Sequence, residues 1–280
     1  MTDFSFAVHD AVVTWLAQGI WNPPGWVIVL YTLGMTHITI AAVTIYLHRC
    51  QAHSALALRA FPAHFFRLWL WLTTGMITKE WVAIHRKHHA KCETIDDPHS
   101  PMIHGIWKVL SQGADLYRDA VRRMWTTEVM ERGVKVLEIH RYSHMTPNDW
   151  VERHLYTRYP WQGVGLMLII DLVLFGAIGA TVWAVQMVWI PFMAAGVING
   201  AGHYWGYRNF PKTATNSSTN ISPWGIIIGG EELHNNHHGY PISARFSVRP
   251  GEFDIGWAYI GALEKLGLAK VKTDKLAPRM

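Results

Sequence analysis

The sequence has few charged residues for its length. Only 16% of its 280 residues are charged, whereas soluble domains average about 25%. Hydrophobic residues make up 50% of the chain, and 15 of its residues are tryptophan. Because tryptophan gathers where apolar protein surface meets lipid headgroups, this composition indicates an integral membrane protein.

Several other features are missing. Cys50 and Cys92 are the only cysteines, which excludes a disulfide framework and a four-cysteine iron site. The sequence has no dinucleotide-binding fingerprint and no haem-binding domain, so we expect the electrons for any redox chemistry to come from a separate protein. No basic stripe is interleaved with aromatics, and we expect no nucleic-acid partner. The first 20 residues lack the basic region of a cleavable signal peptide.

Apolar runs predict the membrane topology. A helix of about 20 apolar residues crosses the ~30 Å hydrocarbon layer, and we expect four such spans, at 4–20, 26–47, 163–183 and 187–206. The first of them is interrupted by His9 and Asp10, and a shorter run at 64–79 is expected to lie at the interface. The fold class expected is therefore an all-α integral membrane protein of about four transmembrane helices, folded as a single domain over 1–280.

Lysine and arginine predict the orientation. The basic residues flank the same ends of the expected spans, and the positive-inside rule places those ends in the cytoplasm. Residues 48–160 and 207–280 are then cytoplasmic, and the helical spacing within 104–160 predicts a helical cap.

Histidines are concentrated at the cytoplasmic ends of the expected spans. Four short motifs, "HRCQAH", "HRKHH", "NGAGH" and "HNNHH", supply nine imidazoles and one amide: His48, His53, His85, His88, His89, Asn199, His203, His234, His237 and His238. Positions i, i+3 and i+4 share one face of a helix, so each H-x-x-H-H motif presents three imidazoles in one direction. By contrast, His48 and His53 are five apart and would diverge on a continuous α-helix.

Nine imidazoles exceed what one metal ion can bind, and they suit two ions with four or five imidazoles each. A structural zinc site would need far fewer ligands. Imidazole alone does not choose among iron, copper, nickel and zinc. Iron is preferred because the expected pair of ions would be redox-capable.

The motifs "HRCQAH", "HRKHHAKCETIDDPHSP" and "GEELHNNHH" resemble the three histidine boxes of the membrane-bound fatty acyl desaturases, specifically the acyl-CoA Δ9 (stearoyl-CoA type) branch. The resemblance extends over about 30–270 and includes the C-terminal "GEFDIGWAYIGALEKLGLA". It implies a cytoplasm-facing di-iron centre that has the nine histidines as ligands and Asn199 bound through water. It also implies insertion of a cis double bond, at Δ9, into a long-chain saturated acyl group with O2 and two electrons. We expect the protein in a bacterial inner (cell) membrane.

Other residues are assigned supporting roles. The carboxylates expected to orient ligand imidazoles are Glu231, Glu232, Asp96 and Asp97. By analogy with the family, Thr32 and Thr36 are expected to set the depth of a substrate tunnel, so that Thr36→Leu would shorten the products. Asp171, a carboxylate inside a span, is either functional or bonded to a neighbouring helix.

The partners are defined only by class. The acyl carrier remains open among CoA, acyl carrier protein and phospholipid. The electron donor is expected to be a ferredoxin, a rubredoxin or a cytochrome b5-like protein with its reductase. Basic residues that could bind the donor or the carrier's phosphates, or that could simply be solvated, are Lys87, Lys91, Arg118, Arg122 and Arg123.

Two alternatives accompany this interpretation. A hydroxylase of acyl or alkane chains, or a ketolase, would use the same histidine boxes with a different placement of substrate. A metal transporter would carry its ligands in the middle of the spans, where His37 is the single histidine deep in an apolar run.

Overall fold

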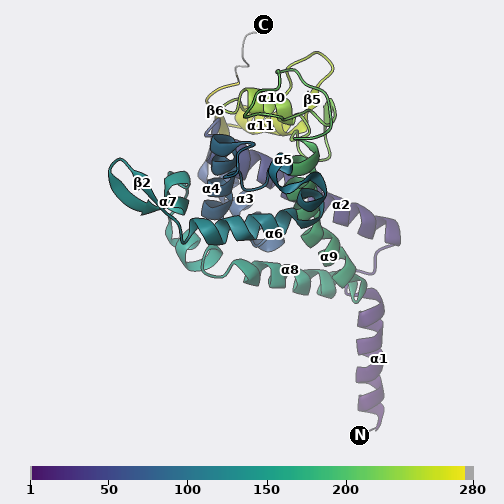
Figure 1. Cartoon of the computed structure of the whole chain (residues 1–280). Helices are drawn as coiled ribbons and strands as arrows, with labels where there is room; N and C mark the ends of the chain where they lie inside the picture. The colour runs from purple at the N-terminus through teal and green to yellow at the C-terminus, as the bar shows by residue number, and fades with distance from the viewer. Residues whose placement is uncertain (1, 275–280) are drawn as a thin grey trace.

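The computed structural model describes residues 2–274, with side chains from residue 6 onward. The chain is mostly helical (Figure 1). The helices of the N-terminal half are α1 (Thr2–Gln18), α2 (Gly25–Ala42), η1 (Val43–Ala52), α3 (Ala60–Thr73), α4 (Thr78–Lys91), α5 (Pro101–His104) and α6 (Ile106–Met124). Those that follow are α7 (Glu138–Tyr142), η2 (Glu152–Tyr156), α8 (Pro160–Phe175), α9 (Ile178–Ile190), η3 (Pro191–Ala201), α10 (His234–Gly239) and α11 (Ile255–Lys265).

Within residues 2–274, three small sheets of two strands each accompany the helices. Strand β1 (Leu56–Leu58) pairs antiparallel with β6 (Ala269–Val271), β2 (Glu128–Glu131) pairs antiparallel with β3 (Val134–Leu137), and β4 (Trp224–Gly225) pairs parallel with β5 (Phe253–Asp254). The first and third sheets join segments that are far apart in the sequence. The β1–β6 sheet fastens the C-terminal region to the segment after η1, whereas the β4–β5 sheet lies within the C-terminal region.

Among the residues that the structure describes, two helices are long and apolar enough to cross a membrane. They are the continuous helices Gly25–Ala52, which joins α2 to η1, and Ile178–Ala201, which joins α9 to η3. The apolar helix α8 is shorter, and α1 is a helix that leads away from the body of the protein (Figure 1). The expected number of four spans therefore stays a proposal.

The boundary between the last two apolar helices differs from the sequence-based expectation. We expected one span over 163–183 and the next over 187–206, but α8 ends at Phe175 and α9 begins at Ile178. Gly176 forms the turn with a φ of +67°, a left-handed conformation that glycine adopts without steric cost. Gly179 follows closely, and a side chain there would collide with the backbone of Asp171. The glycines therefore shape a tight helical hairpin inside an apolar run.

Asp171 connects two of the apolar helices. Its carboxylate is buried in α8 and accepts a hydrogen bond from the Tyr31 hydroxyl of α2 at 3.0 Å. The sequence left open whether Asp171 is functional or bonds to a neighbouring helix, and the structure shows such a bond to α2.

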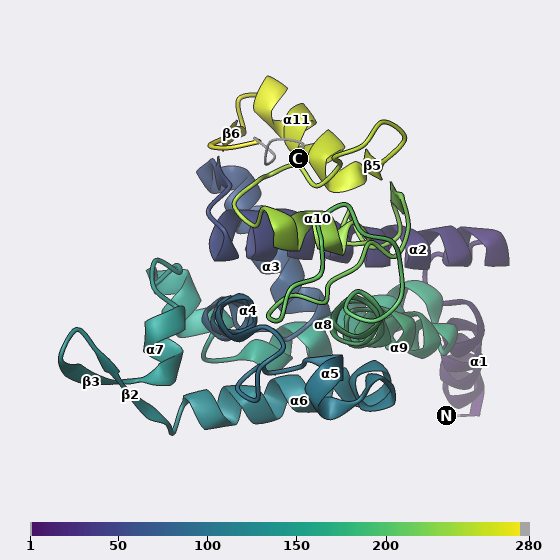
Figure 2. The same ribbon diagram turned by 45° about the horizontal axis from the view of Figure 1, so that its top comes forward.

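Residues 128–137 form a hairpin where the sequence predicted helix. Val134 and Val136 flank Lys135 on β3, and Arg132 and Gly133 make the turn with positive φ values of 51° and 84°. Two consecutive residues with positive φ are typical of the type I′ turn of a two-residue hairpin. The hairpin projects from the body of the protein (Figure 2).

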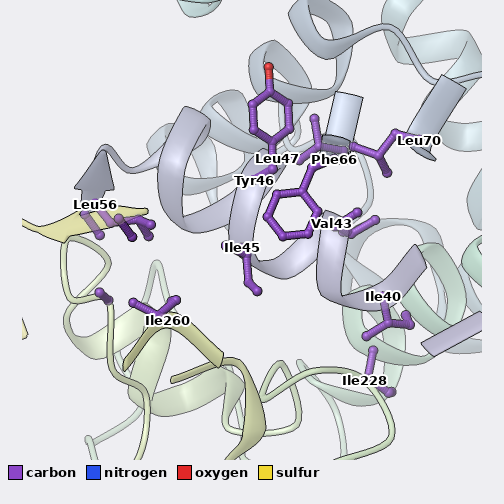
Figure 3. Close-up of a cluster of buried hydrophobic side chains, with 14 of the residues drawn as sticks. Ile40, Val43, Ile45, Tyr46, Leu47, Leu56, Phe66, Leu70, Ile228 and Ile260 are labelled. Atoms are coloured by element: carbon purple, nitrogen blue, oxygen red, sulfur yellow. The ribbon is translucent and has the colours of Figure 1, made fainter. Parts of the chain in front are cut away.

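The core is built around η1. Val43, Ile45, Tyr46 and Leu47 are buried there against α3 and the C-terminal region (Figure 3). Arg49 lies in the same helix and is fully buried, with its guanidinium 2.9 Å from the Asp254 carboxylate at the start of α11. This buried ion pair fastens the C-terminal region to the histidine-bearing end of η1.

Both long apolar helices change to π-helical geometry as they approach the histidines. In η1 the His53 amide donates to the His48 carbonyl at 3.1 Å, a bond between residues five apart. In a π-helix such residues lie one turn above each other, whereas on an α-helix they diverge. This geometry removes the divergence that the sequence predicted for His48 and His53.

Candidate metal centre

Five of the nine histidines converge in a first group. It consists of His48, His53, His85, His89 and His237, whose ligand atoms all lie within 4.8 Å of one another. The His237 Nε2 atom is 3.0 Å from that of His48 and 2.9 Å from that of His89. The Nε2 atoms of His53 and His85 are 2.8 Å apart. Helices η1, α4 and α10 thus direct ring nitrogens at one point.

The other four histidines form a second group beside the first. The Nε2 atoms of His88 and His238 are 3.3 Å apart, and those of His203 and His234 are 2.9 Å apart. His238 also stacks on His89 of the first group with 4.3 Å between ring centroids. The Cys92 sulfur lies within 4.8 Å of ligand atoms of His88, His203 and His238. Asn199 lies on the wall of a cavity that also reaches His234.

The clustered imidazoles are held in the form that binds metals. Burial first, and then the neighbouring imidazoles, keep the pKa values of His53, His85, His89, His234, His237 and His238 well below the usual range. A neutral imidazole has a lone pair available for a metal ion. Nine imidazoles, five of them buried and four half-buried, face one another across about 3 Å and therefore fit two metal ions with all-nitrogen ligands.

Three carboxylates orient histidines from behind. Glu231 accepts from His48 Nδ1 at 2.7 Å, Asp97 from His88 Nδ1 at 2.9 Å, and Glu93 from His203 Nδ1 at 2.9 Å. A proton held on Nδ1 leaves Nε2 free as the ligand atom, so these bonds select both the tautomer and the ring orientation.

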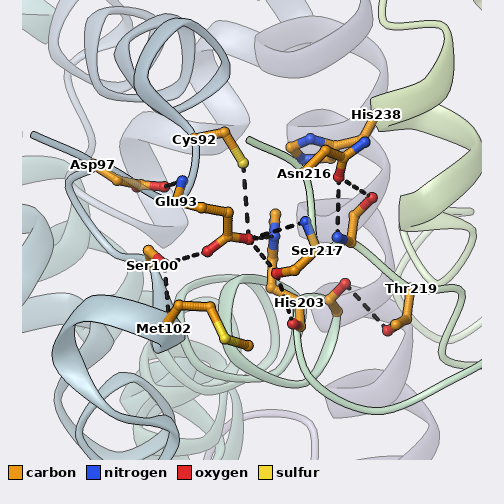
Figure 4. Close-up of polar contacts among 12 residues, drawn as sticks. Cys92, Glu93, Asp97, Ser100, Met102, His203, Asn216, Ser217, Thr219 and His238 are labelled. Atoms are coloured by element: carbon orange, nitrogen blue, oxygen red, sulfur yellow. Dashed lines mark hydrogen bonds and ion pairs between the residues drawn. The ribbon is translucent and has the colours of Figure 1, made fainter. Parts of the chain in front are cut away.

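Glu93 is the orienting carboxylate that the sequence analysis missed. It also accepts hydrogen bonds from the hydroxyls of Ser100 and Ser217 (Figure 4). Burial raises its pKa, but the hydrogen bonds from His203, Ser100 and Ser217 outweigh burial and lower the pKa to about 2. The sequence feature that could have indicated this role is the position of Glu93 two residues after the helix that carries HRKHH.

Two of the expected orienting carboxylates are placed elsewhere. The Asp96 side chain is 60% exposed and lies 3.6 Å from Lys91. Glu232 accepts from the backbone amides of Ile228 and Gly230, at 2.8 and 3.1 Å, and so shapes the loop before α10. Neither carboxylate makes a hydrogen bond to a ligand histidine. Their sequence neighbours do: Asp97 bonds to His88, and Glu231 bonds to His48. We therefore replace Asp96 and Glu232 with Glu93 in the orienting set.

An additional histidine lies against the second group. His99 is buried and stacks on His88 with ring centroids 4.4 Å apart. Burial first, and then His88, lowers the pKa of His99 to about 3. Its Nε2 atom has no hydrogen-bond partner among the described residues, and the ring forms part of the cavity wall.

A cavity of about 360 Å³ borders both histidine groups. This volume lies within the range of roughly 300–1,000 Å³ that is usual for ligand pockets. Besides His48, His85 and His234, its wall consists largely of apolar residues from α4, α6, α9 and η3, including Ile84, Val121, Ile190, Ala194 and Ile198. It is thus suited to an apolar chain that passes beside the imidazoles.

Thr32 and Thr36 are not on the wall of this cavity. Their hydroxyls donate to the carbonyls of Ile28 and Leu33 in their own helix, at 2.8 and 2.9 Å. The cavity reaches α2–η1 only at Val43 and His48, and extends toward the α3–α4 loop and Trp161. The role expected of these threonines in setting tunnel depth is therefore not supported by their position.

The basic residues singled out as docking candidates are mostly paired. Lys87 lies 2.9 Å from Glu138 in a largely buried pair. Arg118 and Arg122 pair with Asp115 and Asp119 one turn earlier on α6, and both arginines also border the cavity. Arg123 lines a separate polar pocket together with Lys87 and Asp97.

Comparison with known proteins identifies the family. The sequence profile described as fatty acid desaturase matches residues 24–262. This chain belongs to the fatty acid desaturase family. The match covers both histidine groups and the long apolar helices, and it supports an oxidoreductase of lipid metabolism.

Individual relatives differ in substrate. The chain is 26% identical over 232 residues to an sn-1 stearoyl-lipid 9-desaturase of Anabaena variabilis, covering 81% of this chain and 76% of the relative. It is 26% identical over 280 residues to Delta-9 acyl-lipid desaturase 2 of Arabidopsis thaliana, covering 99% and 84%. It is 29% identical over 232 residues to an icosanoyl-CoA 5-desaturase of Limnanthes douglasii, covering 82% and 60%. The names thus include two acyl carriers and two double-bond positions.

Proposed function

We propose that this protein is an O2-dependent desaturase that inserts a cis double bond, at Δ9, into a long-chain saturated acyl group at a di-iron centre. The observation that carries the proposal is the cavity with largely apolar walls that borders two groups of converging, buried or half-buried imidazoles. Family membership supports the reaction class.

The proposed ligand set divides between two irons. His48, His53, His85, His89 and His237 bind one, and His88, His203, His234 and His238 bind the other, with Asn199 bound through water. When bound, the irons supply the reductive activation of O2 that oxidation of an unactivated methylene pair requires. Glu231, Asp97 and Glu93 hold the protons on Nδ1 and so keep Nε2 of their histidines available.

The cavity supplies the positioning. Its apolar wall would hold the acyl chain extended, so that one methylene pair lies beside the imidazoles. The same wall excludes water from the reacting carbons. Trp81 stacks flat on His85, with ring centroids 5.0 Å apart and planes at 8°, which keeps that ring aligned at the cavity wall.

The surroundings follow from the family and the apolar helices. We propose that α1, α2–η1, α8 and α9–η3 cross a bacterial inner membrane as part of a single domain over 1–280, with the histidines facing the cytoplasm. Electrons would come from a separate ferredoxin, rubredoxin or cytochrome b5-like protein. The acyl carrier is CoA, acyl carrier protein or a phospholipid, and the relatives named above include both lipid-linked and CoA-linked substrates.

The test is a fatty-acid profile. The chain would be expressed aerobically in a host of known unsaturation, beside a His85→Ala variant, and double bonds would be located by mass spectrometry of dimethyl disulfide adducts. A new cis-monoene at carbon 9 that requires His85 supports the proposal. Hydroxylated chains would indicate the hydroxylase alternative. If the host profile is unchanged, purified protein that contains iron is assayed on stearoyl-CoA, stearoyl-acyl carrier protein and a stearoyl phospholipid, with reduced ferredoxin, rubredoxin and cytochrome b5 in turn. The absence of any monoene in all of these assays would refute desaturation.

A further inference from the structure

One exposed apolar patch lies on the C-terminal region, away from the histidines. The segment "WGIII", which contains β4, carries no charge. Trp224, Ile226 and Ile227 expose 66%, 40% and 61% of their surface, and Phe253, the partner of Trp224 in the β4–β5 pair, exposes 46%. We call these four residues the β4–β5 patch. Four large apolar side chains grouped on one surface indicate a partner.

The patch is fixed to the middle of a long apolar helix. Ile228, which follows the patch, is buried against Ile40 of α2. The Gly229 carbonyl accepts from the Thr44 hydroxyl at 3.2 Å, and a side chain at Gly229 would collide with Ile40 and Thr44. Close to this contact, the Tyr259 hydroxyl of α11 lies 2.7 Å from His37 Nε2. The C-terminal region therefore lies along the continuous α2–η1 helix from His37 in α2 to Thr44 in η1.

The length of the helix places this contact relative to the membrane. The continuous helix Gly25–Ala52 has 28 residues, whereas about 20 residues cover the hydrocarbon layer. A span that begins at Gly25, beside the exposed Trp26, then ends near Thr44, and the buried Arg49 lies beyond it. At ~1.5 Å per residue, His37 is about 10 Å inside that boundary. The segment that holds the β4–β5 patch thus lies at the level of the headgroups and the upper acyl chains.

We propose that the β4–β5 patch inserts into the cytoplasmic leaflet of the lipid bilayer, so that the C-terminal region is anchored in the membrane independently of the spans. Deeper along the same helix, Val29, Leu30 and Leu33 of α2 are 57%, 59% and 50% exposed, as expected of side chains that face lipid in a span beginning at Gly25. Apolar side chains that lie in an interface in this way reach about 5–10 Å into the headgroup and acyl boundary. Tryptophan at its edge is typical of that depth. The inference rests on α2 crossing the bilayer, as proposed above.

The experiment measures depth with spin labels on the full chain in nanodiscs of phosphatidylcholine and phosphatidylglycerol. Ile227→Cys is the test position, and Val29→Cys on α2 is the reference inside the lipid. Ile95→Cys is the matched control, because Ile95 is an isoleucine with 81% exposure that lines the polar pocket with Lys87 and Arg123. Wild-type protein labelled in parallel corrects for Cys50 and Cys92. Power saturation compares accessibility to O2, which partitions into lipid, with accessibility to a water-soluble nickel chelate.

The expected result is a ratio of O2 to nickel accessibility at Ile227 that is closer to that of Val29 than to that of Ile95. A label at Ile227 as accessible to nickel as the one at Ile95 would refute insertion. Low accessibility to both reagents would also refute it, because the patch would then be covered by protein. If Val29 itself is accessible to nickel, the proposed crossing of α2 fails along with the inference. If the label at Ile227 is accessible to nickel and the label at Val29 is not, the inference fails and the proposed crossing of α2 stands.

Discussion

Removing the Glu93 carboxylate should weaken metal binding at the second histidine group alone. Glu93 holds the proton on His203 Nδ1 and accepts from two serine hydroxyls and the Ser217 amide. Glu93→Gln keeps an acceptor facing His203 but removes the charge, whereas Glu93→Ala leaves the buried donors without a partner. Loss of such an orienting group costs roughly 10–100-fold in metal affinity, or about 1.4–2.7 kcal/mol. We expect Glu93→Gln near the lower value and Glu93→Ala near the upper one.

The assay is iron content per chain after dialysis against graded concentrations of a chelator. The wild type should lose its two irons at similar chelator concentrations, while Glu93→Ala should lose one of them much earlier. Asp96→Asn is the matched control, because Asp96 is an exposed carboxylate three residues away whose ion pair is with Lys91. If Glu93→Ala retains both irons as firmly as Asp96→Asn, the bond between Glu93 and His203 does not support a metal ligand and the reasoning is wrong.

Three further predictions concern stability, the cavity and pH. Arg49→Met leaves Asp254 as an uncompensated buried charge and should lower the free energy of unfolding by about 3–5 kcal/mol, measured by thermal unfolding. Arg122→Met, from a largely exposed pair, should lower it by less than about 1 kcal/mol. Equal losses in the two variants would contradict the anchoring role of Arg49. Ala194→Phe, on the cavity wall, should shift products to shorter chains, whereas Thr36→Leu should not; the opposite result would show that the acyl chain runs along α2. Because the pKa values of His85, His89 and His237 are lowered by folding, below pH 6.5 the unfolded metal-free chain binds protons that the folded chain does not. The free energy of unfolding should therefore be steady above pH 6.5 and fall below it, by up to about 1.4 kcal/mol per pH unit for each such histidine. An unchanged melting temperature from pH 7.5 to 5.5 would show that these rings are solvated.

The histidine groups could be anticipated from the sequence because they depend on local periodicity. His85, His88 and His89 lie on one face of α4 whatever the rest of the chain does. The same reasoning reached the wrong structure at 128–137, where valine alternation and the Arg132–Gly133 turn gave a hairpin. It also misplaced the turn at Gly176, because a glycine in an apolar run is compatible with both a continued span and a sharp reversal.

The orienting carboxylates show where local reasoning ends. Glu93, Asp96 and Asp97 lie within five positions, and helical or strand periodicity cannot rank them because the chain there is irregular. Glu93 has a positive φ of 60°, which is uncommon for a residue other than glycine, and it reaches His203, 110 positions away. Asp97 turns back to His88, while Asp96 points outward between them. The role of Glu93 therefore depends on the position of His203, which follows η3. That position is set by the tertiary fold and cannot be read from the residues around HRKHH.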